Sequence, residues 1–258
     1  MALRRRSRRG RAVFRDIVPP GTLAADLYRA GYFPAIELTR RTADRLAAEY
    51  ARSLDALTRD APSDLNRELE TAEQELTRLA LLLRPAMRSW TLAVERWHRG
   101  RWRGAALAAS GVDLSTLLGP EDVASTLETV LERNIGLVKD VAAQARQRMA
   151  TAVYDGLRTR APARDVAKQL REAADLGKAR SVRIASDQLT KVTSALASER
   201  RQQAGVDEWE WVHSRKAHPR EDHQARNGKV YSDANAPADL PGRLPFCGCR
   251  ERAVLRFD

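Results

Sequence analysis

The apolar residues between positions 121 and 157 recur at the spacing of one helix face. They are Leu127, Val130, Leu131, Val138, Val141, Ala145, Met149, Ala152 and Val153, with Asn134 on the same face. A repeat of about 3.6 residues is the period of an α-helix that buries one side. Gly119 and Pro120 interrupt the chain directly before it, so the pattern predicts a long amphipathic helix over about 121–157.

Similar apolar stripes predict further helices on both sides of this segment. They cover about 37–59, the stretch from Asp64 to Pro85, a stretch that starts near 163 or 164, and 178–203. Proline lacks an amide hydrogen, so Pro85 should end or kink its helix, and Pro34 should break the helix-friendly stretch that follows Gly21. Gly205 is a natural stop for the last helix.

The pattern changes at Gly205, after which tryptophan, histidine, cysteine, proline and glycine become frequent. Short alternating runs at Glu208–His213, Lys229–Ser232 and Ala253–Phe257 predict strands. We therefore predict a mainly α protein, with an elongated helical body followed by a small C-terminal α+β module that zinc could stabilise. The expected division is a flexible arginine-rich arm over 1–18, the helical body over 19–204, and the C-terminal module over 205–258.

The amino-acid composition limits the classes of protein to which this chain can belong. Among 258 residues, 43% are apolar, which is enough for a core, whereas 5% are aromatic, which disfavours a large β-sandwich. The net charge of +11 favours contact with a polyanion, although charge alone carries no base specificity. Two cysteines one residue apart exclude a disulfide framework. No apolar run approaches the roughly 20 residues that span a bilayer, and no apolar signal segment follows the first arginines, so we expect synthesis in the cytosol and no membrane contact.

The first residues are dense in arginine. The positively charged positions that could contact nucleic acid or an acidic protein surface are Arg4, Arg5, Arg6, Arg8, Arg9 and Arg11. Like charges at this density repel one another, which favours a flexible arm. Two interpretations stay open for this arm: a contact to nucleic acid or to an acidic protein surface, and a solvated tail without a partner.

Tryptophans alternate with arginines between positions 90 and 103. Aromatic rings interleaved with arginine can stack on bases. Tryptophans at this spacing more often bury one helix face while the arginines reach water, and we favour that interpretation for Trp90, Trp97 and Trp102.

Three histidines and two cysteines lie between positions 213 and 249. Zinc binds four nitrogen or sulfur ligands and can hold together a small module that lacks a core. Cys247 and Cys249 would supply two thiolates, His223 is the best third ligand, and His218 or His213 would be the fourth. In the alternative, the histidines form ordinary hydrogen bonds and the cysteines are small reduced apolar residues.

The same region carries a family resemblance. The residues that match in order and spacing are Trp211, His213, Ser214, Pro219, Arg220, His223, Gly228, Pro241, Gly242, Cys247 and Cys249. This pattern resembles the C-terminal motif of the phage Mu F-like head-morphogenesis family, the minor head or minor capsid proteins. The chain departs from the family in having Gly248 between the cysteines, and Ile184–Asp187 where an Ala-Arg-Thr-Glu helix start is frequent.

The resemblance implies a bacteriophage minor capsid protein without catalytic residues. Proteins of this kind associate with the phage portal protein, with the major capsid protein or scaffold, and non-specifically with packaged DNA. It also implies a place in the virion, inside the head or at the portal vertex, after assembly in the host cytoplasm.

Two other function classes compete with this one. A metal-dependent nuclease could use His223, Cys247 and Cys249 as ligands, with Glu221 or Asp222 as the base. A free DNA-binding regulator would explain the charge, but the chain has neither a persuasive helix-turn-helix nor the spacing of a zinc finger.

Overall fold

The protein is mainly helical and carries a small antiparallel sheet. A computed structural model describes residues 10–56, 61–113 and 123–257. The chain forms two compact units. A sheet unit takes the described parts of Met1–Pro20, Leu92–Glu128 and Asp187–Asp258, and a helical unit takes Gly21–Thr91 and Thr129–Ser186. The long helices α3 (Ala61–Ser110), α4 (Ala124–Thr159) and α5 (Ala163–Gln203) each contribute to both units.

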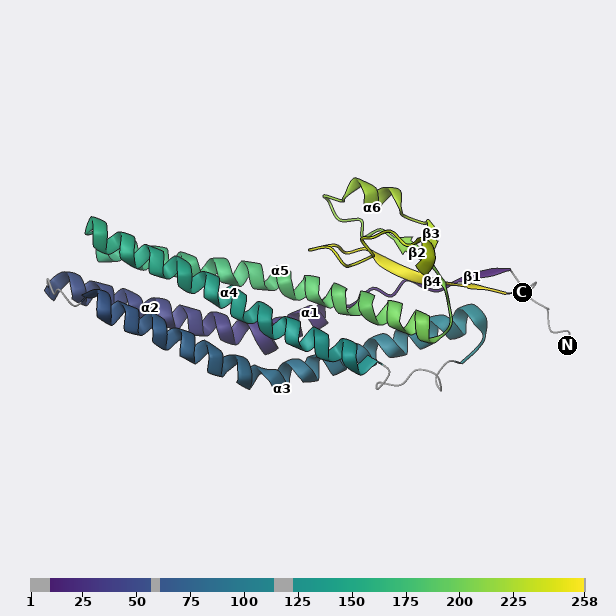
Figure 1. Ribbon diagram of the computed structural model, residues 1–258, viewed down its shortest axis with the longest axis horizontal. Helices are drawn as coiled ribbons and strands as arrows, with labels where there is room; N and C mark the ends of the chain where they lie inside the picture. The colour runs from purple at the N-terminus through teal and green to yellow at the C-terminus, as the bar shows by residue number, and fades with distance from the viewer. Residues whose placement is uncertain (1–9, 57–60, 114–122, 258) are drawn as a thin grey trace. The chain divides into compact units, whose positions relative to one another are not determined.

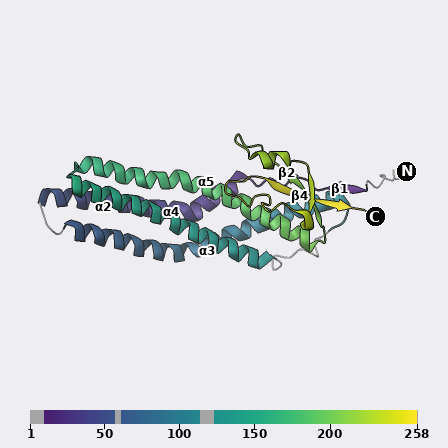
Figure 2. The same cartoon turned by 45° about the horizontal axis from the view of Figure 1, so that its top comes forward.

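The helical unit is a bundle of antiparallel neighbours. It is built from α1 (Gly21–Leu27), α2 (Phe33–Ala56) and the parts of α3, α4 and α5 that belong to it, which run side by side in both views (Figure 1 and Figure 2). Every long helix contributes to its apolar core. The buried residues are Ala43, Leu46, Tyr50, Leu65, Leu69, Met149, Ala152, Val153, Val166, Leu170, Ala173 and Ala174. These positions follow the helical spacing that the sequence shows, so the predicted stripes are the faces that pack.

Neither Pro34 nor Pro85 ends a helix. Pro34 is the second residue of α2, directly after a π-helical turn over Tyr28–Tyr32 that joins α1 to α2. Pro85 lies inside α3, which continues to Ser110. The predicted break at Pro34 is therefore replaced by a change of helix type, and the predicted end at Pro85 is wrong, although the prediction of a kink there is not tested.

The segment 163–203 is one helix where the sequence predicts two. α5 runs from Ala163 to Gln203 without interruption. Gly177 lies where the two predicted helices would meet, but a glycine inside a helix costs only about 1 kcal/mol relative to alanine. Burial of Leu170, Ala174, Ile184 and other residues on both sides of it outweighs that cost.

The sheet has four antiparallel strands in the order β1-β4-β2-β3. The strands are β1 (Arg11–Val13), β2 (Glu208–Val212), β3 (Val230–Ser232) and β4 (Arg250–Arg256). Trp209 pairs with Tyr231 on one side and with Ala253 on the other. The three predicted strands are present, and β4 begins three residues earlier than Ala253.

Strand β1 falls within the predicted flexible arm. Residues 1–9 lie outside the described residues, but Arg11–Val13 pair with Val254–Arg256 of β4. Asp16 then accepts hydrogen bonds from both Nε and Nη2 of Arg250, at 2.8 and 2.7 Å. The arm prediction over 1–18 is wrong for its last part, because a free edge of β4 offers backbone partners that a local charge pattern does not reveal.

The sheet packs against helices and is not a separate module that begins at residue 205. Its unit also contains Leu92–Ser110 of α3 and Asp187–Gln203 of α5. Phe14, Trp102 and Ala253 share one apolar cluster, in which the rings of Phe14 and Trp102 are 5.3 Å apart. A sheet this short cannot bury one face by itself, so it recruits helices from earlier in the chain.

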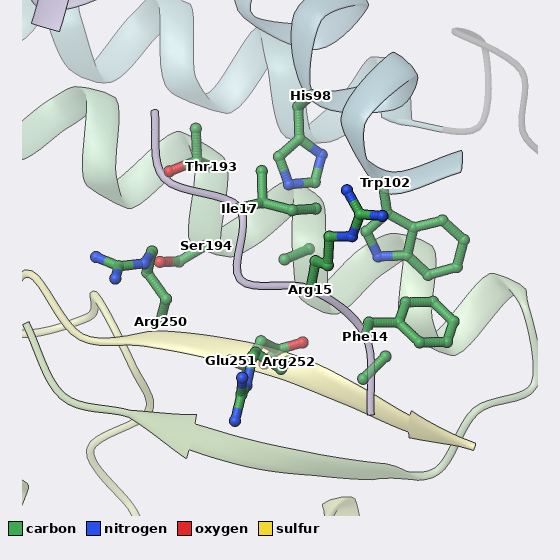
Figure 3. A pocket seen from close by; sticks show the side chains of 12 residues that line it. Phe14, Arg15, Ile17, His98, Trp102, Thr193, Ser194, Arg250, Glu251 and Arg252 are labelled. Atoms are coloured by element: carbon green, nitrogen blue, oxygen red, sulfur yellow. The ribbon is translucent and has the colours of Figure 1, made fainter. Parts of the chain in front are cut away.

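The N-terminal segment crosses between β4 and these helices. Figure 3 shows Phe14, Arg15 and Ile17 on a segment that passes between β4 and the helices that carry His98 and Thr193. The cavity among these side chains measures about 20 Å³, which is room for one water molecule. It is a packing gap and not a ligand site.

The sheet unit buries charged groups as well as apolar ones. Arg200, Glu95 and His98 are each 1% exposed, and Arg200 Nη2 donates to Glu95 Oε1 at 2.6 Å. Arg200 also contacts His98 Nδ1. Burial, followed by the charge of Arg200, lowers the pKa of His98 to about 3, so this histidine is a neutral hydrogen-bond acceptor.

None of the described helices has both the length and the apolar character needed to cross a membrane.

Candidate metal centre in the sheet unit

The structure brings three of the predicted ligands together. His223, Cys247 and Cys249 each offer one ligand atom, and these atoms all lie within 4.8 Å of one another. Nδ1 of His223 is 3.4 Å from Sγ of Cys247 and 3.6 Å from Sγ of Cys249. Their exposed fractions are only 2–3%. Within the described part of the chain, no other His, Cys, Asp and Glu side chains form such a group.

Local structure explains how residues distant in the sequence meet. His223 lies on the short helix α6 (Glu221–Ala225), and the cysteines lie in the turn that leads into β4. A Cβ on Gly248 would lie 2.9 Å from Cβ of Ser214 and 2.9 Å from Cε of Lys216. The glycine between the cysteines, a departure from the family pattern, therefore lets the turn lie directly against the segment after β2.

A carboxylate orients the histidine ring. Nε2 of His223 lies 2.8 Å from Oδ2 of Asp239, and Nη1 of Arg226 donates to Oδ1 of Asp239 at 2.6 Å. Burial would raise the pKa of Asp239, but the hydrogen bonds from His223 and Arg226 bring it below its ordinary value. The charged carboxylate favours a proton on Nε2, which leaves the lone pair of Nδ1 directed at the two sulfur atoms.

The two thiols contact each other and differ in pKa. The hydrogen bond from Cys249 lowers the pKa of Cys247 to about 5, against the effect of burial, and backbone N–H groups of Cys249 and Gly242 lower it further. The same bond raises the pKa of Cys249. One sulfur of the pair is thus an anion at neutral pH.

Trp211 forms the wall of the cluster. It is 0% exposed, and its ring meets that of His223 edge to face at 5.0 Å between centroids. The guanidinium of Arg226 lies 5.1 Å from the centroid of the indole. The indole N–H has no acceptor with good hydrogen-bond geometry, and its interaction with Cys249 lowers the pKa of that thiol.

Helix α5 fastens the loop that precedes the cysteines. Nζ of Lys191 donates to the carbonyl oxygens of Gly242, Arg243 and Leu244, at 3.2, 3.1 and 2.9 Å. Asp187 Oδ1 accepts from the backbone N–H of Phe246 at 2.7 Å. Sequence reasoning missed both α5 residues. Their separation by four places on one helix face is a weak signal, because most such pairs are solvated.

The residues of the sequence motif have distinct structural roles. Gly242 has a φ of 73°, and a Cβ there would collide with Ser194 of α5. Arg220 Nη2 donates to the carbonyl of Pro245 at 3.1 Å, and the N–H of Gly228 donates to the carbonyl of Trp211 at 2.8 Å. The motif therefore encodes one compact arrangement of loops around the cluster.

Two predicted ligands lie elsewhere. His218 is exposed, and His213 is partly exposed and accepts a hydrogen bond from its near neighbour Arg215 through Nδ1. Neither belongs to the group of three ligand atoms. The prediction that one of them is the fourth ligand is not supported, because the loop after β2 contacts the cysteine turn through Ser214, Lys216 and Arg220 and not through its histidines.

The predicted contact residues of the arm are mostly outside the described chain. Arg4, Arg5, Arg6, Arg8 and Arg9 lie there. Arg11 is described, and its Nη2 forms an ion pair with Glu210 at 3.4 Å.

Comparison with known proteins matches the region that carries this cluster. The family model described as "Phage Mu protein F like protein" matches residues 144–252. This segment is similar to Phage Mu F-like proteins. It includes the end of α4, all of α5 and the complete His–Cys–Cys group, which confirms the resemblance that the motif indicates. The similarity suggests a phage head-morphogenesis protein, and hence a component of the virion.

A protein of Haemophilus influenzae (strain ATCC 51907 / DSM 11121 / KW20 / Rd), described as an uncharacterized protein, is 28% identical over 149 residues. The match covers 57% of this chain and 33% of the relative, so the chain corresponds to about a third of that protein's length. No solved structure matches the chain.

Proposed function

We propose that this chain is a minor head protein that acts in phage head morphogenesis through binding and not through catalysis. The observation that carries the proposal is the match of residues 144–252 to the Mu F-like family. The matched residues include helix α5 and the loops that build the His–Cys–Cys group. The part that resembles the family is therefore folded, and its residues have identifiable structural roles around that group.

The portal protein, the major capsid protein or scaffold, and packaged DNA are the proposed partners, at the portal vertex or inside the head. The net charge of +11 supports non-specific contact with DNA phosphates. Affinity for duplex DNA should then fall steeply between about 50 and 200 mM salt and should not depend on sequence. Equal affinity for specific and random duplexes is the expected result, and strong preference for one sequence would favour a regulator instead.

The experiment for the structural role is mass spectrometry of purified, DNA-filled heads from the phage that encodes the chain. We expect peptides of this protein in a few copies per head, and co-purification of the full chain with the portal protein from infected cells. Its absence from heads and from portal complexes would contradict the proposal.

The burial of the His–Cys–Cys group supports the proposal that this group does not act as a catalytic metal site. A catalytic metal needs a position that substrate and water can reach, whereas these three side chains are 2–3% exposed. Incubation of the full chain with duplex and single-stranded DNA, with Mg²⁺, Mn²⁺ or Zn²⁺ added, should leave the DNA intact. Cleavage that disappears in Cys247→Ser would overturn this part of the proposal.

A further inference from the structure

We propose that the sheet unit binds one Zn²⁺ ion through three protein ligands, Nδ1 of His223 and Sγ of Cys247 and Cys249. Asp239 is the positioning residue for the imidazole, and neither His213 nor His218 is a ligand. The inference rests on the geometry of these side chains and does not depend on the proposed function.

The spacing of the ligand atoms fits a tetrahedral ion. With Zn–S near 2.3 Å and Zn–N near 2.0–2.1 Å, tetrahedral angles place sulfur and nitrogen about 3.5 Å apart. The structure has 3.4 and 3.6 Å for the two S–N distances. Hydrogen-bonded thiols alone do not require both sulfurs to lie at nearly equal distances from one imidazole nitrogen.

The histidine is already in the form that a metal needs. A metal-binding imidazole commonly donates its other N–H to a carboxylate, which fixes the ring and raises its basicity. Asp239 holds Nε2 at 2.8 Å and is itself held by Arg226 at 2.6 Å. The ring therefore cannot turn away without breaking a partly buried, charge-assisted hydrogen bond.

Hydrogen-bond donors lie around the two sulfur atoms. Backbone N–H groups of Gly242 and Cys249 interact with Cys247, and the N–H groups of Ser214 and of the Trp211 indole interact with Cys249. The indole N–H is fully buried and has no hydrogen-bond partner among the described residues. Two buried anions so close together would be costly alone, and a dication would neutralise them.

Zinc suits this ligand set better than other common ions. Thiolate and imidazole ligands select zinc or another soft transition metal over Mg²⁺ or Ca²⁺, which prefer oxygen. A metal would also join two short stretches that are separate in the sequence: helix α6 and the turn before β4. Binding energy at such a site is folding energy.

All six histidine and cysteine residues of the chain are described, so substitutions can test the full set. The full chain, produced without a histidine tag, is analysed for metals after dialysis. We expect about one zinc per chain in the wild type, in His213→Ala and in His218→Ala, and none in Cys247→Ser/Cys249→Ser. Metal-free wild-type protein, another metal in place of zinc, or equal loss in a His213 or His218 variant would overturn the proposal.

A cysteine variant could lose zinc because it fails to fold, so a milder change is needed. Asp239→Asn should still bind Co²⁺ with the charge-transfer absorption of two thiolates, but with affinity about 10–100-fold lower. Asp222→Asn is the matched control, because Asp222 lies exposed on the same helix α6. Affinity unchanged in Asp239→Asn, or lowered equally in Asp222→Asn, would contradict the positioning role.

This proposal and the proposed function can fail separately. A metal-free protein that is nevertheless found in phage heads would overturn the zinc site alone. A zinc-binding protein that is absent from heads and from portal complexes would overturn the proposed function alone.

Discussion

The two units of this molecule are stabilised in different ways. The helical unit has a core of leucine, valine, alanine, methionine and tyrosine drawn from α2, α3, α4 and α5. The sheet unit has small apolar clusters, and it buries Arg200, Glu95 and His98 as well as the His–Cys–Cys group. An apolar core spreads its stability over many contacts, whereas the sheet unit depends on a few directional contacts.

The difference predicts how each unit responds to substitution. Truncation of one aliphatic side chain removes a small part of a large buried apolar area, and neighbouring side chains can relax into the space. Loss of one partner from a buried charged pair leaves the other unsatisfied, with no such relaxation. A larger fraction of single substitutions should therefore destabilise the sheet unit than the helical unit.

The largest effect is expected for Arg200→Ala. Within the described part of the chain it leaves Glu95 buried with only Arg99, 3.4 Å away, as an ion-pair partner, and it should lower the free energy of unfolding by about 3–5 kcal/mol. Chemical denaturation of the full chain measures this change. Replacement of both partners, Arg200→Met with Glu95→Leu, should restore most of the loss. A double variant no better than Arg200→Ala would contradict the idea that an unpaired charge is the cause.

A somewhat smaller effect is expected for Leu170→Ala in the helical unit. Leu170 is 0% exposed, and its truncation should cost about 2–5 kcal/mol. Leu170→Met, which keeps the volume, should cost less than about 1.5 kcal/mol. The same denaturation measurement applies, and similar losses in the two variants would show that shape, not buried volume, dominates this core.

The pH dependence of the sheet unit should be traceable to Glu251. Burial raises the pKa of Glu251 from 4.5 to about 7, although Arg201, 3.2 Å away, lowers it and Asp233 raises it. Because the folded pKa is raised, the stabilising contribution is present below about pH 4.5 and is lost as pH rises through about 7. The free energy of unfolding should fall over this window, and Glu251→Gln should flatten that slope. An unchanged slope in Glu251→Gln would assign the pH dependence to other groups.

The smallest effect is expected for Arg158→Ala on the surface of the helical unit. Arg158 pairs with Asp155 at 3.3 Å, but the two side chains are 75% and 60% exposed. The shift in melting temperature should correspond to a change of less than about 0.5 kcal/mol in the free energy of unfolding. A loss comparable to that of Arg200→Ala would remove the contrast between exposed and buried pairs.

The sequence predicts the helical unit well because its signal is local. A stripe of apolar residues at helical spacing is visible within one segment, and the residues that become buried, such as Leu131, Met149 and Val153, are members of that stripe. The prediction fails where a tertiary contact outweighs the preference of the local sequence. Pro85 stays within α3, and Arg11–Val13 pair with β4 although their charges indicate a free arm.

The candidate site is predictable in its ligands but not in its supports. Histidine and cysteine are rare in this chain, so His223, Cys247 and Cys249 stand out by residue type. Asp239 and Lys191 belong to common types, and Lys191 lies 51–53 residues from the carbonyl groups that it contacts. No spacing rule connects residues so far apart, and only the fold shows that His213 and His218 lie outside the cluster.

Hydrogen exchange of the full chain, followed by mass spectrometry before and after removal of zinc with a chelator, tests the contrast between the units most directly. We predict that peptides covering 208–256 lose protection after chelation, while peptides covering 129–186 keep theirs. Protection that does not change in 208–256, or that falls equally in both regions, would contradict a sheet unit held together by its metal.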